Sequence, residues 1–132
     1  SALAGNPQVV HIVDESLMAG LSCGEVSLLG WDILKAGARH FLTISDAPVA
    51  PLMQLMASGA GGKTPVVAGE SAIAGLAGLI GTVNNPQLAR EIGLDTKSRI
   101  LLFGTEGATD PALYHELTGT RVEEVIPPGS QS

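Results

Sequence analysis

The stretch RILLFGTEGATDPALYHELTG, residues 99–119, carries the clearest information about the fold of this chain. Its apolar beginning, residues 99–103, predicts a β-strand. A glycine-rich loop follows, and Asp110-Pro111 then predicts the start of a helix, because aspartate caps helix N-termini and proline fits the first turn. This helix is expected to stop at Gly119. A strand that leads into a helix in this way is typical of α/β proteins.

The rest of the chain continues the alternation of short apolar runs and helical patterns. Strands are predicted at residues 9–13 (VVHIV) and 40–44 (HFLTI), with a short extended segment at 65–68 and a flexible connection at 58–64. Helices are predicted at 28–36, at 49–56 with Asp46 as N-cap, at 73–80 and at 85–93. The pattern predicts a three-layer α/β/α fold, with a short parallel or mixed sheet covered on both faces.

Two glycines lie inside the helix predicted at 73–80. Gly75 and Gly78 each cost a helix about 1 kcal/mol relative to alanine. Glycine at such positions indicates that something approaches the helix backbone closely, and we expect either another helix or a ligand there.

The composition excludes several classes of function. The chain has 7 Lys+Arg against 13 Asp+Glu, a formal charge of −6 and no basic cluster, so no nucleic-acid partner is expected. The longest apolar stretch, residues 71–83, is shorter than the roughly 20 residues that span a bilayer, so no membrane partner is expected either. The sequence shows no signal-peptide pattern, and the single cysteine, Cys23, cannot form an internal disulfide. The expected compartment is therefore the reducing cytoplasm.

Three loops lie where α/β proteins bind ligands, between a predicted strand and the N-terminus of a helix. They are residues 18–25 (MAGLSCGE), 68–71 (AGES) and 103–111 (FGTEGATDP). On residue type alone each loop has two readings, a ligand crevice or an ordinary set of caps and turns. His11, His40 and His115 lack the spacing of metal ligands, and Cys23 lacks a neighbouring base. We therefore expect neither a metal site nor a cysteine nucleophile.

Three longer segments are more specific in combination. They are MAGLSCGEVSLLGWDIL (18–34), VVAGESAIAGLAGL (66–79) and SRILLFGTEGATDPALYHEL (98–117). In this order and at these separations they resemble the C-terminal portion of the diaminopropionate ammonia-lyases, which are pyridoxal-phosphate enzymes of the tryptophan-synthase-β-like class, fold type II. The resemblance implies that residues 1–126 are the C-terminal part of a large cofactor-binding domain, cut from a longer polypeptide. The tail, residues 127–132, is expected to be disordered.

The resemblance also implies which residues face the cofactor. Thr105 occupies the place where these enzymes present a hydroxyl to the pyridine nitrogen. A hydroxyl does not force a charge onto the ring, and this milder electron sink favours β-elimination. Glu70 is expected to contact the cofactor, and Gly69 to allow its close approach. The complete cofactor-binding set implied by the resemblance is Thr105, Glu70, Gly69, Ser71, Ser22 and Gly24.

The resemblance places other essential parts outside this chain. In these enzymes the lysine that binds the cofactor and the loop that binds its phosphate both lie upstream, and Lys35, Lys63 and Lys97 lie in no comparable motif. We therefore expect no catalytic residue here, and no binding of pyridoxal phosphate by this chain alone. The reaction implied for a complete protein is β-elimination from 2,3-diaminopropionate, which yields pyruvate and ammonia.

Two alternatives remain open. A serine or threonine dehydratase of the same fold shares the arrangement less closely, and the contacts that choose between substrates are expected upstream. The other alternative is a non-catalytic α/β domain that serves in binding or assembly. The enzymatic readings imply a small amino acid as partner. Because part of a domain exposes apolar helix faces, we also expect a homo-oligomer.

Overall fold

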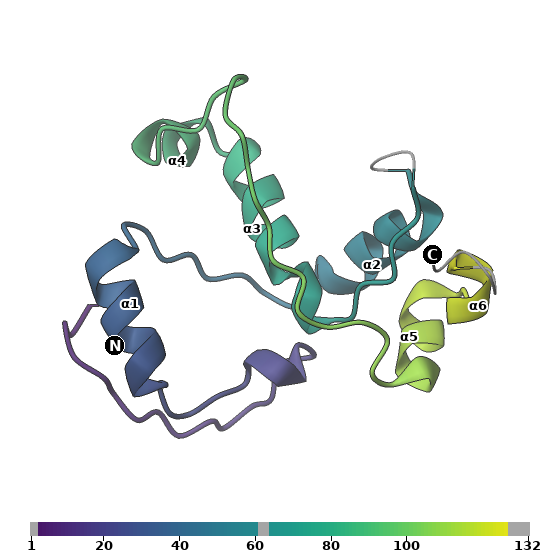
Figure 1. The fold of residues 1–132 in the computed structure, drawn as a ribbon, viewed down its shortest axis with the longest axis horizontal. Coiled ribbons are helices and arrows are strands. Elements are labelled where there is room, and N and C mark those ends of the chain that lie inside the picture. The colour runs from purple at the N-terminus through teal and green to yellow at the C-terminus, as the bar shows by residue number, and fades with distance from the viewer. Residues whose placement is uncertain (1–2, 61–63, 127–132) are drawn as a thin grey trace.

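The computed structural model describes residues 3–60 and 64–126, and the regular secondary structure in those ranges is helical throughout (Figure 1). Two short 3₁₀ helices, η1 (Ala19–Leu21) and η2 (Ser71–Ile73), accompany the α-helices. These are α1 (Leu28–Gly37), α2 (Val49–Ser58), α3 (Ala74–Val83), α4 (Pro86–Glu91), α5 (Pro111–Thr118) and α6 (Val122–Val125). The disordered tail predicted at 127–132 and part of the connection predicted at 58–64 lie outside the described residues.

Capping residues visible in the sequence set several helix boundaries. At α4 the Asn85 side chain accepts a hydrogen bond from the Leu88 N–H at 3.1 Å. At α5 one carboxylate oxygen of Asp110 accepts from the N–H groups two and three residues further on, at 2.9 and 3.1 Å. Gly59 and Gly119 end α2 and α5 in the left-handed conformation, with φ of 68° and 73°. The helix starts predicted at Asn85 and Asp110, and the stop at Gly119, are confirmed.

The start of α2 differs from the prediction. Pro48, and not Asp46, is the N-cap residue, and it forms no side-chain cap hydrogen bond. The Asp46 carboxylate instead accepts hydrogen bonds from the Ser16 hydroxyl at 2.6 Å and from the Leu17 N–H at 2.7 Å. The prediction of Asp46 as the cap of α2 is wrong because distant partners, which local spacing does not reveal, occupy its carboxylate.

The core lies between α2, η2, α3 and α5. On α2 the predicted apolar face is buried, with Val49, Leu52 and Met53 at most 8% exposed. Ile73 of η2 and Tyr114 of α5, each 1% exposed, pack in the same cluster. The face predicted for α2 is therefore confirmed. Helix α1 lies apart from these helices (Figure 1).

The described residues contain no sheet. Residues 9–13, 40–44 and 99–103, each predicted as a strand, are connecting segments without strand pairing (Figure 1). Within the described ranges, the main-chain hydrogen bond that links these runs to another segment joins the Val10 N–H to the Gly24 carbonyl at 2.8 Å. A strand requires a paired neighbour, and apolar composition alone does not supply one. The predicted three-layer α/β/α fold is therefore wrong, and the chain is a helical structure with long connections.

The unpaired runs leave a large apolar surface. The chain exposes 9578 Å², whereas a compact monomer of 13.4 kDa exposes about 6,500 Å². Val13, Leu101 and Phe103 are 88%, 75% and 76% exposed. The difference in area exceeds the total surface that a standard protein–protein interface buries, about 1,600 Å².

Two of the runs pack against the glycines of α3. A Cβ on Gly75 would lie 3.5 Å from Leu102 Cδ2, and a Cβ on Gly78 would lie 3.7 Å from Leu42 Cδ1. An added Cβ at either glycine would make only ordinary van der Waals contacts with these apolar side chains, so the close approach by a helix or a ligand predicted there is not observed among the described residues. Residues of both runs and of α3 line an apolar hollow of about 500 Å³.

Candidate functional site

The turn formed by residues 69–71 belongs to one of the three predicted ligand loops, and the other two loops contact it. It leads directly into η2 and α3, and its residues are buried. The 104–107 segment contacts one side of the turn, and Gly20 of η1 contacts it from the 18–25 loop. Segments separated by about 35 or more residues in sequence are therefore joined around these three residues.

The contact between the turn and the 104–107 segment is made mostly by main chain. The Gly69 N–H donates to the Glu106 carbonyl at 3.1 Å. A Cβ on Gly69 would lie less than 3.0 Å from both the Gly107 carbonyl oxygen and Glu106 Cγ. Glycine at position 69 thus allows close approach of a loop of this same chain, which is a different neighbour from the cofactor that the resemblance implies.

Glu106 makes the second contact through its side chain. Its Oε2 accepts a hydrogen bond from the Ser71 N–H at 2.9 Å, and its Oε1 lies 3.5 Å from the Thr109 hydroxyl. Glu106 is not among the site residues predicted from the sequence. Its place in the glycine-containing stretch Gly104–Gly107, shortly after the apolar run 99–103, was the available signal.

Ser71 joins the turn to η1. Its Oγ accepts a hydrogen bond from the Gly20 N–H at 3.1 Å, and the side chain is 8% exposed. A Cβ on Gly20 would lie 2.9 Å from that oxygen, so the approach is close. The Ser71 hydroxyl therefore has a structural partner of its own, whether or not it also meets a ligand.

Thr105 and Glu70 differ in accessibility. The Thr105 side chain is exposed, and the neighbouring Gly104 lies beside Ala72, since a Cβ on Gly104 would be 3.7 Å from the Ala72 Cβ. Glu70 is 9% exposed. Both residues are next to contacts made by Glu106. Thr105 directly precedes Glu106 in the sequence, and Glu70 lies between Gly69 and Ser71, the two residues of the turn that Glu106 binds. Their backbone positions are thus held together by the same contacts.

Ser22 and Gly24 belong to a different neighbourhood. The Ser22 N–H donates to the Ala19 carbonyl at the end of η1. Gly24 pairs with Val10, whose carbonyl oxygen would lie 2.6 Å from a Cβ on Gly24. No hydrogen bond between described residues joins either of them to the 69–71 turn. The structure thus brings together Gly69, Glu70, Ser71 and the segment that carries Thr105, while Ser22 and Gly24 remain in the adjoining loop.

A carboxylate also holds the beginning of the 18–25 loop. The hydrogen bonds from the Ser16 hydroxyl and the Leu17 N–H lower the pKa of Asp46 below its ordinary value of 3.8. The Ser16 oxygen in turn accepts from the Met18 N–H at 3.1 Å. Asp46 and Ser71 thus fix the two ends of the 16–20 segment against the core.

A hollow of about 310 Å³ lies next to the turn. Glu106 and Gly104 line it together with Met56, Val66, Val67, Ala68, Ala72, Ile73, Leu76 and Leu102. Its size is at the lower limit for ligand pockets. Glu106 is the one ionisable side chain in its wall, and its carboxylate already accepts the Ser71 N–H.

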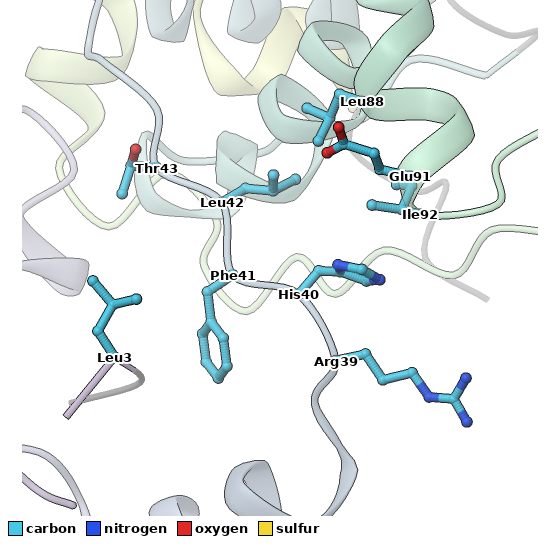
Figure 2. Close-up of a pocket in the computed structure, with 9 residues that line it drawn as sticks. All are labelled: Leu3, Arg39, His40, Phe41, Leu42, Thr43, Leu88, Glu91 and Ile92. Carbon is cyan, nitrogen blue, oxygen red and sulfur yellow. The ribbon is translucent and has the colours of Figure 1, made fainter. Parts of the chain in front are cut away.

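Another hollow, of about 730 Å³, lies away from the predicted site, between residues 39–43 and α4 (Figure 2). Leu88, Glu91 and Ile92 form its α4 side, and the Phe41 side chain points away from α4 in Figure 2. None of the residues predicted to bind a cofactor lines this hollow. Across the described ranges no group of three or more His, Cys, Asp or Glu side chains is placed to hold a metal ion. None of the helices described has the length and apolar character needed to cross a membrane.

The chain is similar to known proteins over part of their length. No family model matches the chain. The chain is 33% identical over 117 residues to the diaminopropionate ammonia-lyase of Salmonella typhimurium (strain LT2), an alignment that covers 86% of the chain. It is also 33% identical over 115 residues to the Escherichia coli (strain K12) protein of the same name, with 85% of the chain covered. The chain spans 29% of the length of each of these relatives. This similarity points to the family that the sequence motifs resemble.

The residues around the turn fit one end of pyridoxal phosphate. The exposed Thr105 hydroxyl suits a ring nitrogen, and the turn beside it carries the buried Glu70. The three loops contain no lysine or arginine that could pair with the phosphate end. The N–H of Ser71 at the start of η2 is occupied by the Glu106 carboxylate. The residues of the three loops therefore offer groups whose chemistry suits the ring, and their side chains offer no positive charge to the phosphate.

Proposed function

We propose that this chain forms the ring-facing part of the cofactor site in a pyridoxal-phosphate-dependent lyase that acts on 2,3-diaminopropionate. The observation that carries the proposal is the 33% identity to diaminopropionate ammonia-lyases over 86% of the chain. The joining of the 69–71 turn to the 104–107 segment supports it, since both lie in the motifs that resemble this family. The implied products are pyruvate and ammonia.

Each residue has a defined role in this proposal. The Thr105 hydroxyl forms a hydrogen bond with the pyridine nitrogen and places no full charge beside it. Glu70 borders the ring from the 69–71 turn, where burial restricts its side chain. When bound, the cofactor supplies the electron sink that β-elimination requires. The described residues of this chain orient the ring and shield it from water on the α3 side.

The phosphate, the covalent attachment of the cofactor and the recognition of the amino acid are assigned to other parts of a complete protein. This division is the one that the resemblance implies, and it is consistent with the absence of basic side chains from the three loops. It also agrees with the fraction of the relatives' length that the chain covers, 29%.

The test is turnover by the complete protein that contains this chain. We expect it to bind pyridoxal phosphate with a visible absorption band, and to release pyruvate and ammonia from 2,3-diaminopropionate faster than from serine or threonine. Faster turnover of serine or threonine would instead support a dehydratase. If the protein neither acquires the absorption band nor releases ammonia from any of the three amino acids, the proposal is wrong.

A further inference from the structure

Glu106 contacts both ends of the 69–71 turn. Its main-chain carbonyl accepts the Gly69 N–H at 3.1 Å, and its carboxylate accepts the Ser71 N–H at 2.9 Å. The aliphatic part of the side chain covers Gly69, since a Cβ there would lie 2.9 Å from Glu106 Cγ. One residue therefore fixes the turn at two points, with Glu70 between them.

These contacts link two segments that no element of secondary structure connects. Residues 99–107 reach the turn as an irregular segment, so no ladder of hydrogen bonds sets their position. Thr105 precedes Glu106 directly, and Glu70 lies between the residues that Glu106 binds. The distance between Thr105 and Glu70 is consequently determined by Glu106.

If Glu106 only capped a helix, fewer contacts would be expected. A capping carboxylate satisfies an N–H group at a helix start and stabilises that helix. Glu106 also covers Gly69, lies 3.5 Å from the Thr109 hydroxyl and lines the 310 Å³ hollow. Its side chain thus adds to the main-chain contact that attaches the loop after the 99–103 run to the turn at the start of η2.

We propose that Glu106 is a positioning residue that holds Thr105 and Glu70 in the arrangement needed to bind the cofactor ring. The inference rests on the proposed function, because it assigns the ring to these two residues. Glu106 itself does not touch the ring in this arrangement. It acts through the main chain of the 69–71 turn and of the 104–107 segment.

The experiment compares the complete protein that contains this chain, freed of cofactor, with three variants of it. E106A removes the carboxylate, whereas E106Q keeps an oxygen that accepts the Ser71 N–H without the charge. E116A is the matched control, because Glu116 is exposed on α5. Amide hydrogen exchange at Ser71 and Gly69, followed by NMR, reports the contacts directly. The ring probe is pyridoxine, which has neither the phosphate nor the aldehyde and so cannot react with a lysine.

We expect E106A to lose the protection of the Ser71 amide and to keep that of Gly69, whose partner is a main-chain carbonyl. Pyridoxine should shift the amide resonances of Glu70 and Thr105 in the unchanged protein. Its affinity should fall about tenfold in E106A, because displacement of binding groups weakens a well-oriented contact. E106Q should restore most of the affinity, and E116A should leave it unchanged.

Several results would overturn the inference. Unchanged exchange at Ser71 in E106A would show that the contact does not hold the turn. Lost protection at Ser71 with unchanged pyridoxine affinity would show a purely structural role. E106Q that binds as weakly as E106A, with Ser71 still protected, would show that charge and not position matters. No pyridoxine binding in the unchanged complete protein would overturn the ring assignment, and with it the inference, while the exchange data would still report the Glu106–Ser71 contact separately.

Discussion

The carbonyl oxygen of Gly107 occupies the space next to Gly69 that any other residue would need for its Cβ. We predict that Gly69→Ala destabilises the chain by about 1–3 kcal/mol, because the new methyl group meets main chain that cannot rotate away. Gly81→Ala is the matched control. It lies in α3 with nothing within 4 Å of the new Cβ, and it should stabilise the chain by up to about 1 kcal/mol. Denaturant unfolding of both variants measures the difference, and equal midpoints would contradict the packing seen at Gly69.

Asp46 should make stability depend on acid pH. Hydrogen bonds from Ser16 and Leu17 lower its pKa in the folded chain, so the unfolded state binds its proton more readily. The stabilisation is therefore present above the ordinary value of 3.8 and is lost as the pH falls through the lowered folded pKa. Urea midpoints between pH 2 and pH 6 test this at roughly one-unit intervals. Asp46→Asn should flatten the curve, whereas the same change at the exposed Asp32 of α1 should leave the slope in place.

The hydrogen bond from Gly20 to Ser71 should control the mobility of the 18–25 loop. Ser71→Ala removes the acceptor, and because Gly20 is accessible to water, the loss of global stability should not exceed about 1 kcal/mol. Limited proteolysis should cleave near η1 faster in this variant. Ser58→Ala, at the exposed end of α2, should leave the cleavage rate there unchanged. Equal cleavage in both variants would show that Ser71 does not restrain the loop.

Two substitutions of Tyr114 separate the contributions of its ring and of its hydroxyl to stability. The side chain is 1% exposed, burial raises the pKa of its phenol, and its hydroxyl has no hydrogen-bond partner among the described residues. Tyr114→Phe should therefore be neutral or stabilising by up to about 2 kcal/mol, since it removes an unpaired polar group from the core. Tyr114→Ala should cost about 3–5 kcal/mol through loss of the ring. A marked loss of stability in the Phe variant would show that the hydroxyl has a partner.

The exposed apolar runs should drive self-association. Phe103, 76% exposed, is the largest of these side chains in the 99–103 run. Sedimentation velocity at increasing concentration should show oligomers of the 132-residue chain, and Phe103→Lys should shift them toward monomer. Thr96→Lys adds the same charge at an exposed turn position and serves as the control. A chain that stays monomeric at high concentration would contradict the prediction of a homo-oligomer.

Helix starts were predictable from the sequence, and the arrangement of the connecting runs was not. Asn85 and Asp110 cap their helices with local partners, so short-range spacing contains the information. Asp46 looks like the same kind of cap, yet its partners lie 29 and 30 residues away. A strand likewise depends on a neighbour, and an apolar run such as 99–103 reports its own composition only.

The candidate site likewise combines features that were predictable from local sequence with others that were not. Its loops were identifiable because glycine, serine and acidic residues gather at 69–71 and 104–107. Which loops would meet, and through which side chain, depended on contacts across the chain. Glu106 was missed for this reason, and Ser22 and Gly24 were grouped with residues to which no described hydrogen bond joins them.

The glycines of α3 have a consequence for the order of folding. A ten-residue helix that contains Gly75, Gly78 and Gly81 loses about 3 kcal/mol of intrinsic helix propensity relative to alanine, and helices this short are marginal even with favourable sequences. Helix α3 is therefore expected to form only once Leu42 and Leu102 have packed against its glycines. Helices α2 and α5 contain no glycine and pack together around Met53 and Tyr114, so they would assemble first, and α3 would form as the late step that fixes the connecting segments in place.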